Sequence, residues 1–467
     1  MIFKQFYLKC LAHASYFIAD ENEAVIVDPQ RDVDIYIDEA QKNGLKIKAI
    51  IETHLHADFV SGHLELAKRT GAEIYVGHLA KAGFEHKAVK NGDGLQLGNI
   101  QMKFLETPGH TPEGISVLID SGDQTPLKLL TGDTLFIGEV GRPDLVASVG
   151  YDADDMASML YDSLRNVIMT LPDSTEIYPA HGAGSACGKK IGKEKSSTLA
   201  KQKENNYALQ EMNKDEFIAM ITKDLPKAPD YFSHDVQMNK GGAKQLEELP
   251  KLLPLNSKEL STMKGLVTLL DVRTVHEYSL SHIEGSINIG LNGAFAPWVG
   301  EILIPTEAII VVANSEEQSQ EAQLRLARIG YENVLGYLDK AFLNSQNEDF
   351  KLIKTPLLSA DEMKELLEGS VEVQLVDVRK PDEFKGGYIM NAVNIPLNEL
   401  NNRLDELDAN KKVACNCAGG YRSTLALSIL EKNGFKGSVN LDGGIASWKD
   451  AGLSLSPSNT NKKRDRE

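Results

Sequence analysis

The sequence contains little cysteine and no long apolar run. Four cysteines among 467 residues are too few for a disulfide scaffold, and they fit a reducing compartment where thiols serve chemistry or metal binding. No run of about 18 apolar residues occurs, so we expect no membrane-spanning helix. The first residues also lack the continuous apolar segment of a secretory signal peptide. The sequence therefore predicts a cytoplasmic protein without a membrane partner.

An excess of positive charge is missing as well. Lysine and arginine total 50 against 67 aspartates and glutamates, which gives a formal net charge of −17 at pH 7. Nucleic-acid binding normally requires a basic stripe, so no nucleic-acid partner is expected. The length suggests about two to four domains, and the hydrophobic content of 42% is ordinary for globular domains.

Potential metal ligands follow the predicted strands of the first half. Residues 24–28 and 48–53 are predicted to be buried strands and residues 152–169 a helix. The candidate ligands are His54, His56, Asp58, His110, Asp133 and His181. Imidazole and carboxylate together suit zinc, iron, nickel or manganese, and loops at strand ends commonly carry function in α/β sheets. The pattern predicts a metal centre.

The second half contains an internal repeat. Residues 269–289 match residues 374–395, with Asp, Arg, Glu, Ile and Asn recurring at corresponding positions. Such a repeat predicts a duplicated module of about 100 residues. The order of strands and helices in each copy favours a small parallel α/β sheet.

The two copies differ in one loop. The second copy has Cys417, a glycine-containing turn and Arg422 before a helix, whereas the first copy has Ala313 and Gln318 at the corresponding positions. Backbone N–H groups and the helix dipole in such a loop stabilise a thiolate or persulfide anion. We expect the second copy to be active. We expect the first to be inactive, serving as a scaffold or as the surface of a homo-oligomer.

The motifs THLHAD, TPGHT, TGD and YPAHG resemble, in order and spacing, those of the metallo-β-lactamase superfamily. The resemblance implies an αββα sandwich over residues 1–250 with metal at the strand ends. Two-metal hydrolases of this family need a histidine where this sequence has Phe59. A second metal would keep only Asp58 and His181 as strong ligands, so a one-metal centre is expected.

The stretch GEVGRPDL (138–145) also resembles the persulfide dioxygenase branch of that superfamily. This resemblance implies one Fe(II) per chain held by His54, His110 and Asp133, with three open positions for O2 and a substrate sulfur. The neighbouring groups His56, Asp58 and His181 would then support the ligands or bind water. Two further residues have two candidate roles each. Arg142 would bind an anionic substrate group or form a structural ion pair, and Cys187 would be an accessory thiol or a small turn residue.

The motifs DVR, CAGGYRS and LDGGIASW resemble the rhodanese family. The resemblance implies an active rhodanese domain at residues 358–455, with Cys417 as nucleophile and Arg422 as its cation. It also implies a degenerate rhodanese-like domain at residues 256–355. Residues 456–467 are expected to be a disordered tail. The fold class predicted for the chain is therefore α/β, a metallo-β-lactamase sandwich followed by two rhodanese-like domains.

Together the resemblances imply an enzyme of sulfide detoxification. It would oxidise a low-molecular-weight thiol persulfide, of the glutathione, coenzyme A or bacillithiol type, with O2 to sulfite. Cys417 would pass sulfane sulfur to sulfite and give thiosulfate. Two alternatives stay open. One is a thioester hydrolase of the glyoxalase II type, which needs no O2, and the other is a non-enzymatic persulfide carrier that binds metal only structurally.

Overall fold

The computed structural model describes residues 1–122, 125–145, 150–225, 227–345 and 350–456. The chain forms two compact units. Unit 1 comprises Met1–Leu249 with Leu324–Glu332, and unit 2 comprises Pro250–Gln323 with Asn333–Glu467. The tail expected over residues 456–467 lies outside the described residues except for Ser456. Within the described ranges, no helix is long and apolar enough to cross a membrane.

Unit 1 is built on two six-stranded sheets. The first contains, in spatial order, β1 (Ile2–Leu8), β2 (His13–Asp20), β3 (Glu23–Val27), β4 (Lys46–Glu52), β5 (Glu73–Gly77) and β6 (Lys87–Val89). The second contains β12 (Ser197–Thr198), β11 (Glu176–Pro179), β10 (Lys128–Gly132), β9 (Ile115–Asp120), β8 (Ile100–Glu106) and β7 (Gly94–Leu97). The strands β3 to β6 pair parallel, as do β10 and β11, and the other neighbours pair antiparallel.

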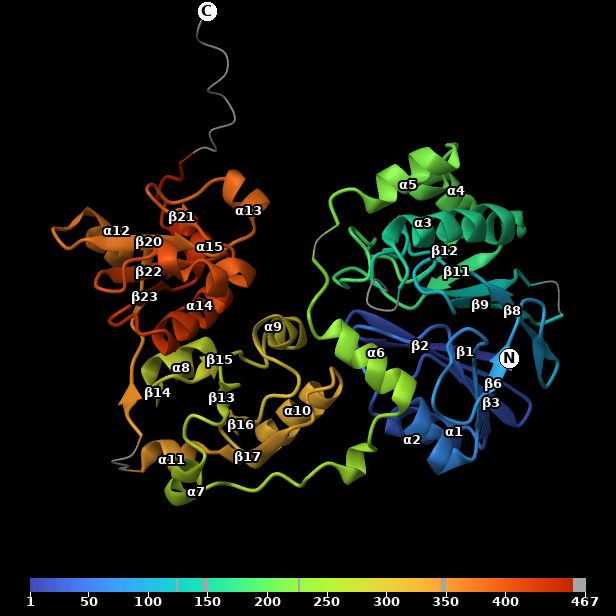
Figure 1. Cartoon of the computed structure of the whole chain (residues 1–467), viewed down its shortest axis with the longest axis horizontal. Helices are drawn as coiled ribbons and strands as arrows, with labels where there is room; N and C mark the ends of the chain where they lie inside the picture. Colours follow the sequence, from blue (N-terminus) through green and yellow to red (C-terminus); the bar gives the residue numbers. More distant parts are fainter. Residues whose placement is uncertain (123–124, 146–149, 226, 346–349, 457–467) are drawn as a thin grey trace, which may run out of the picture. The chain divides into compact units, whose positions relative to one another are not determined.

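The two sheets of unit 1 enclose an apolar core. Successive side chains on a strand point to opposite faces, and inward-facing ones such as Val27, Ile51 and Phe104 are fully buried between the sheets. The helices of this unit are α1 (Asp34–Lys42), α2 (His63–Thr70), α3 (Ala153–Asp162), α4 (Leu199–Asn205), α5 (Lys214–Thr222) and α6 (Phe232–Gly241). Residues of α1 and α2 pack on the first sheet, and residues of α3 to α5 pack on the second (Figure 1). The predicted αββα sandwich is confirmed.

The predicted elements of unit 1 lie close to the observed ones. The strands expected at residues 24–28 and 48–53 are β3 and β4. The helix expected over residues 152–169 begins as α3 and continues through two short turns, η2 (Ser163–Val167) and η3 (Ile168–Thr170). Asp152 caps α3 by accepting a hydrogen bond from the Asp155 amide, which is the usual role of an aspartate before a helix. Two further short turns are η4 (Tyr207–Leu209) and η5 (Leu246–Glu248).

Unit 2 contains the two repeated modules, each with a parallel sheet. In the first module the strand order is β15 (Ile287–Asn288), β13 (Thr268–Asp271), β16 (Ile309–Val312) and β17 (Val334–Leu338), and β14 (His282–Ile283) pairs with β18 (Leu352–Ile353). In the second it is β19 (Leu357–Leu358), β23 (Val439–Leu441), β22 (Lys412–Asn416), β20 (Val373–Asp377) and β21 (Val393–Asn394). Neighbouring strands within each main sheet pair parallel, as the repeat predicted.

Helices surround both sheets of unit 2. The first module has α7 (Ser257–Thr262), α8 (Val275–Leu280), α9 (Phe295–Ile302), α10 (Glu316–Ala327) and α11 (Lys340–Asn344). The second has α12 (Ala360–Glu368), α13 (Pro381–Lys385), α14 (Tyr421–Lys432) and α15 (Gly444–Asp450), with short turns η6 (Leu397–Asn402) and η7 (Leu404–Glu406). The colours of Figure 1 show the second module following the first along the chain.

The repeated Asp-x-Arg motif is structural in both modules. Arg379 Nε lies 2.9 Å from Asp377 Oδ1, and the Nδ2 atom of Asn394 donates to the carbonyl oxygen of Asp377 at 2.9 Å. Arg273 and Asp271 make the matching ion pair in the first module, at 3.0 Å. A buried ion pair is stable only when its remaining polar atoms are also bonded, which explains why the whole group of residues recurs.

Candidate metal centre and sulfur-transfer site

The candidate metal centre lies in unit 1, where residues that follow three strands converge. His54 follows β4, His110 follows β8 and Asp133 follows β10. The Oδ2 atom of Asp133 lies 3.7 Å from His54 Nε2 and 3.5 Å from His110 Nε2. All three side chains are buried, and among the described residues none of these three atoms has a hydrogen-bond partner. Because buried polar atoms rarely stay unpartnered, the group fits a metal ion.

Gly132 makes the close approach of Asp133 and His54 possible. Its φ of +51° lies in the left-handed region, which glycine adopts without steric cost. A Cβ atom at this position would lie only 2.8 Å from the Cβ atom of Thr53. A side chain here would therefore push the end of β10 away from the loop that carries His54.

Hydrogen bonds orient both histidines so that Nε2 faces the centre. The Thr53 hydroxyl donates to Asp28 at 2.9 Å, so its oxygen accepts from His54 Nδ1, also at 2.9 Å. The Nδ1 atom of His110 donates to the carbonyl oxygen of Arg142 at 2.9 Å. Burial also lowers the pKa of both histidines. The two rings are thus neutral and present a free Nε2 lone pair, as metal ligands require.

Replacing Thr53 with valine tests the chain from Asp28 to His54. Valine keeps the shape of threonine but leaves His54 Nδ1 without its acceptor. We expect the dissociation constant for a divalent metal ion at this centre to rise about 10–100-fold, as is typical for the loss of a hydrogen bond to a ligand. Competition with a chelator under anaerobic conditions measures this constant. Thr70→Val in α2 is the control because the hydrogen bonds of its hydroxyl are local, to Leu66 and from the Ala72 amide. An unchanged constant in Thr53→Val would contradict the assignment.

His181 connects the ligand Asp133 to a second carboxylate. Its Nδ1 lies 2.7 Å from Asp133 Oδ1, and its Nε2 lies 2.9 Å from Asp58 Oδ2. Burial lowers the pKa of His181, but the two carboxylates outweigh burial and hold it well above the usual value. Burial by itself raises the pKa of the Asp133 carboxyl. The charge of His181 and its hydrogen bond outweigh this effect and hold the pKa of Asp133 well below its usual range. His181 therefore keeps the candidate ligand Asp133 ionised, and the supporting role of His181 and Asp58 stays a prediction.

Cys187 completes a second group of potential ligands that the sequence did not predict. Its thiol lies with Asp58 and His181, so that one ligand atom from each falls within 4.8 Å of the others. The expectation that a second metal would find only two strong ligands here is therefore corrected to three. Burial raises the pKa of Cys187 well above the usual value. In the absence of metal the thiol is protonated and a poor nucleophile, which weakens the idea of an accessory thiol.

His56 belongs to a third group of potential metal ligands, together with Asp28 and Glu52. Its Nε2 lies 3.3 Å from Asp28 Oδ1 and 3.7 Å from Glu52 Oε2. The ring of Phe59 packs against His56 at 4.4 Å between centroids and is fully buried. Residues 53–62 form a loop and not a strand, and although the ring centroids of His54 and His56 lie 4.1 Å apart, the side chains at positions 54, 56 and 58 do not enter one ligand group. Each of them instead enters a different polar group.

Asn239 in α6 holds this loop in place. Its Nδ2 donates to the carbonyl oxygens of His56 at 2.8 Å and Phe59 at 2.7 Å, and its Oδ1 accepts from the Ser61 amide at 2.8 Å. Nothing in the sequence marked Asn239, because it lies some 180 residues from the loop. Asp28 did carry a signal, since it follows a predicted strand as the recognised ligands do.

Arg142 contacts the metal centre with its backbone carbonyl and not with its side chain. Its carbonyl oxygen accepts from His110, as described above. Its guanidinium is buried and forms two hydrogen bonds to Asp144, both at 2.7 Å. These contacts favour the structural ion pair over the binding of an anionic substrate group.

The sulfur-transfer site lies in the second module of unit 2. Cys417 follows β22, and its buried sulfur accepts hydrogen bonds from the Gly420 amide at 3.1 Å and the Ser423 hydroxyl at 3.4 Å. These donors stand at the start of α14 and stabilise a thiolate. Burial raises the pKa of Cys415, two residues earlier, which identifies Cys415 as the inert thiol of the pair.

Arg422 is paired with Glu383 of α13. The two guanidinium nitrogens Nη1 and Nη2 lie 2.7 and 2.8 Å from the two carboxylate oxygens. The hydrogen bonds from Arg422 lower the pKa of Glu383. Such a two-point bond fixes the plane of the guanidinium but compensates its charge. Arg422 therefore keeps its predicted place beside Cys417, with a partner that the sequence did not suggest.

In the corresponding loop of the first module, a side chain of the chain itself occupies a backbone N–H donor. The side-chain oxygen of Gln318 accepts from the Asn314 amide at 2.7 Å, which uses a backbone donor that an anion would need. Asn314 in turn donates through Nδ2 to Glu277 at 3.0 Å. With Ala313 where the second module has Cys417, the loop agrees with the inactivity predicted for this module.

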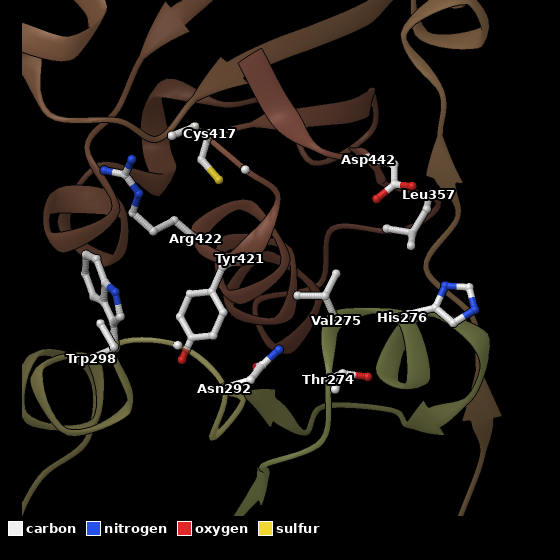
Figure 2. A pocket seen from close by; sticks show the side chains of 14 residues that line it. Thr274, Val275, His276, Asn292, Trp298, Leu357, Cys417, Tyr421, Arg422 and Asp442 are labelled. Carbon is white, nitrogen blue, oxygen red and sulfur yellow. The ribbon is translucent and has the colours of Figure 1, made fainter. Parts of the chain in front are cut away.

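A cavity of about 600 Å³ opens at Cys417. Figure 2 shows the Cys417 sulfur directed into this space and Arg422 and Tyr421 beside it. The cavity lies within unit 2, and residues of the first module also line it.

Comparisons with known proteins agree with this architecture. The family model described as "Metallo-beta-lactamase superfamily" matches residues 8–181. The model described as "Rhodanese-like domain" matches twice, at residues 256–348 and 359–451. A solved structure, a metallo-beta-lactamase from Staphylococcus aureus subsp. aureus COL, is 34% identical with a TM-score of 0.65, covering 72% of this chain and 98% of that one.

Two curated relatives match the first part of the chain. The cytoplasmic hydroxyacylglutathione hydrolase of Arabidopsis thaliana is 34% identical over 183 residues, which is 38% of this chain and 67% of the relative. The mitochondrial persulfide dioxygenase ETHE1 of Bos taurus is 30% identical over 175 residues, which is 36% of this chain and 63% of the relative. The chain thus spans about two thirds of the length of these relatives, and one is a hydrolase and the other a dioxygenase.

Proposed function

The chain belongs to the metallo-beta-lactamase superfamily and carries two rhodanese-like domains, and on this premise we propose that it is a persulfide dioxygenase with sulfurtransferase activity. The proposed first reaction is RSSH + O2 + H2O → RSH + SO3²⁻ + 2 H⁺. The proposed second reaction joins this sulfite to a sulfane sulfur held on Cys417 and gives thiosulfate.

The ligand set of His54, His110 and Asp133 carries the first part of the proposal. Two imidazoles and one carboxylate on one face of a metal are typical of non-haem Fe(II) oxygenases. These three residues would hold one Fe(II), which would supply the redox chemistry for a reaction of O2 with a persulfide. The bovine relative named a persulfide dioxygenase supports an oxidative reaction at this site.

The surrounding residues of the chain prepare this site without touching the substrate. Thr53 and the Arg142 carbonyl hold the two imidazoles in the ligating tautomer. His181 keeps Asp133 ionised and bonds its Oδ1 atom, which leaves Oδ2 as the ligand. Phe59 fills the position of a further ligand with an apolar ring that cannot bind metal. Together they favour one metal with open positions.

The sulfur transfer uses Cys417 as a nucleophile. The thiolate attacks the outer sulfur of a second persulfide, the donor S–S bond breaks, and its electron pair leaves on RS⁻. Sulfite then attacks the terminal sulfur of Cys–S–S⁻, which releases thiosulfate and returns the thiolate. Both steps are redox-neutral exchanges. The Gly420 amide at 3.1 Å and the Ser423 hydroxyl at 3.4 Å stabilise the thiolate that leaves.

Oxygen uptake tests the proposal. The apo-protein is loaded with Fe(II) anaerobically and mixed with glutathione persulfide or coenzyme A persulfide in the presence of O2. We expect one O2 to be consumed for each sulfite formed, whether the sulfite is recovered as such or as thiosulfate. We also expect one iron per chain. The control is the same protein without iron, and the absence of O2 uptake with both persulfides would contradict the dioxygenase assignment.

A thioester hydrolase is the second candidate, and two observations favour it. One is the identity to the Arabidopsis hydrolase, and the other is the group formed by Asp58, His181 and Cys187, which offers a second metal position. The hydrolase would bind two metals per chain and cleave S-lactoylglutathione without O2. Metal content after loading, together with hydrolysis measured anaerobically, separates the two functions.

A further inference from the structure

We propose that the degenerate first rhodanese-like module binds the organic part of the persulfide that loads Cys417. The inference rests on the proposed sulfur transfer at Cys417 and adds a substrate-binding role for the inactive module. Half of the residues around the cavity belong to that module, among them Val275, His276, Asn292 and Trp298. A scaffold role alone, as predicted for this module, does not account for the side chains that it places around the reactive cysteine.

The size of the cavity points to an organic ligand. Its volume of about 600 Å³ lies in the range of sites that hold small organic molecules, roughly 300–1,000 Å³. Sulfite or thiosulfate alone would leave most of this space empty. In Figure 2 the Cys417 sulfur faces the cavity from the second module, while Trp298, Asn292 and Val275 rise from the first module on the opposite side.

The wall formed by the first module is fixed to the Cys417 loop. Tyr421, the first residue of α14, donates from its hydroxyl to the Gly290 carbonyl oxygen at 2.8 Å. A Cβ atom on Gly293 would lie 2.3 Å from the Tyr421 ring, so glycine is required for this close packing. Further along α14, Glu431 accepts from the Gly285 amide at 3.0 Å. The cavity thus has a defined shape, set by hydrogen bonds and packing between the two modules.

The chemistry of the lining indicates which class of thiol fits. Among the described lining residues, only Arg422 and His276 can carry positive charge, and Arg422 is already bound to Glu383. Asp442 adds a negative charge. A carrier rich in phosphate would need several free cations, whereas Trp298 and Asn292 suit a ligand with amide or hydroxyl groups. The geometry points to a small zwitterionic thiol of the peptide or amino-sugar type, and away from coenzyme A.

The test compares an organic donor with an inorganic one. Full-length protein is mixed with glutathione persulfide or with thiosulfate, and the gain of one sulfur atom on Cys417 is followed in single turnovers by intact mass spectrometry. In Trp298→Ala we expect the half-saturating concentration of glutathione persulfide to rise about tenfold, as for loss of an aromatic anchor. Loading from thiosulfate should change less than about twofold, because this anion has no organic part for Trp298 to contact.

His276→Ala tests the same cavity wall independently, in case Trp298→Ala fails to fold. The His276 side chain is exposed, so its removal leaves the core intact, and we expect a smaller rise for glutathione persulfide alone. Ile304→Ala is the matched control, because Ile304 is 63% exposed, belongs to the same module and does not line the cavity. Wild-type behaviour of both cavity variants, or an equal effect on both donors, would overturn the inference.

The choice of carrier is tested on the wild-type protein with coenzyme A persulfide. We expect a lower loading efficiency than with glutathione persulfide, and an equal or higher efficiency would overturn the zwitterionic class. Failure of Cys417 to gain sulfur from any donor would instead contradict the sulfur transfer itself. The proposed function and the role of the first module therefore fail in different experiments.

Discussion

Replacing Asp133 with alanine is expected to abolish iron binding and O2 uptake while leaving sulfur loading of Cys417 intact. The substitution removes one of three ligands and leaves His181 Nδ1 without its carboxylate partner at 2.7 Å. Loss of a group that merely supports a ligand costs about 10–100-fold, so loss of the ligand should reduce O2 uptake by at least about 100-fold. Iron content after anaerobic loading and the rate with glutathione persulfide measure the effect.

Two further variants make the Asp133 result specific. Asp133→Asn keeps the shape and one oxygen but not the charge, so we expect weaker iron binding than in the wild type and stronger binding than in Asp133→Ala. Asp38→Ala removes an exposed aspartate from α1 and should change neither iron content nor rate. Full iron content in Asp133→Ala would exclude this carboxylate as a ligand.

Replacing Cys417 with serine is expected to shift the product from thiosulfate to sulfite. A serine hydroxyl cannot hold a sulfane sulfur, so the rate of thiosulfate formation should fall by at least about 1,000-fold, as for loss of other covalent nucleophiles. Iron content and O2 uptake should be unchanged, because the candidate ligands all lie in unit 1. Quantifying both sulfur anions in one reaction measures the shift.

Cys415 provides the matched control for the Cys417 variant. It lies two residues away on β22, and burial raises its pKa, so it is a poor nucleophile. Cys415→Ser should therefore retain thiosulfate formation, even if the buried hydroxyl lowers the stability of the domain. Thiosulfate formed at the wild-type rate by Cys417→Ser would remove Cys417 from the pathway.

The local pattern of the sequence determined most of the architecture. Alternation of apolar strands with amphipathic helices, and polar residues at the strand ends, predicted an α/β domain with a metal centre, and the resemblance of the motifs to the metallo-β-lactamase superfamily implied the sandwich. The duplicated motif predicted two similar modules, because each Asp-x-Arg group forms its ion pair within its own module. These features depend on residues close in sequence or on regular periodicity, which a single chain displays directly.

Only the tertiary structure decided how the polar side chains group. Cys187 joins Asp58, and Asn239 pins the loop of His56, through contacts between residues far apart in sequence. The partners of the His56 ring, Asp28 and Glu52, were equally hidden, because residues 53–62 form a loop whose course a strand pattern does not predict.

The pairing of cations and the use of the inactive module were also decided in three dimensions. Arg422 was expected to meet an anion of the substrate, and Arg142 either such an anion or a structural ion pair, and each guanidinium binds a carboxylate of the chain, Glu383 and Asp144. A sequence shows that a charge exists but not which partner reaches it. In the same way, the sequence of the first module showed that it lacks the cysteine of the second. Trp298 of the first module lines the cavity of Cys417 because the first module packs on α14 of the second. No local sequence pattern indicates this packing.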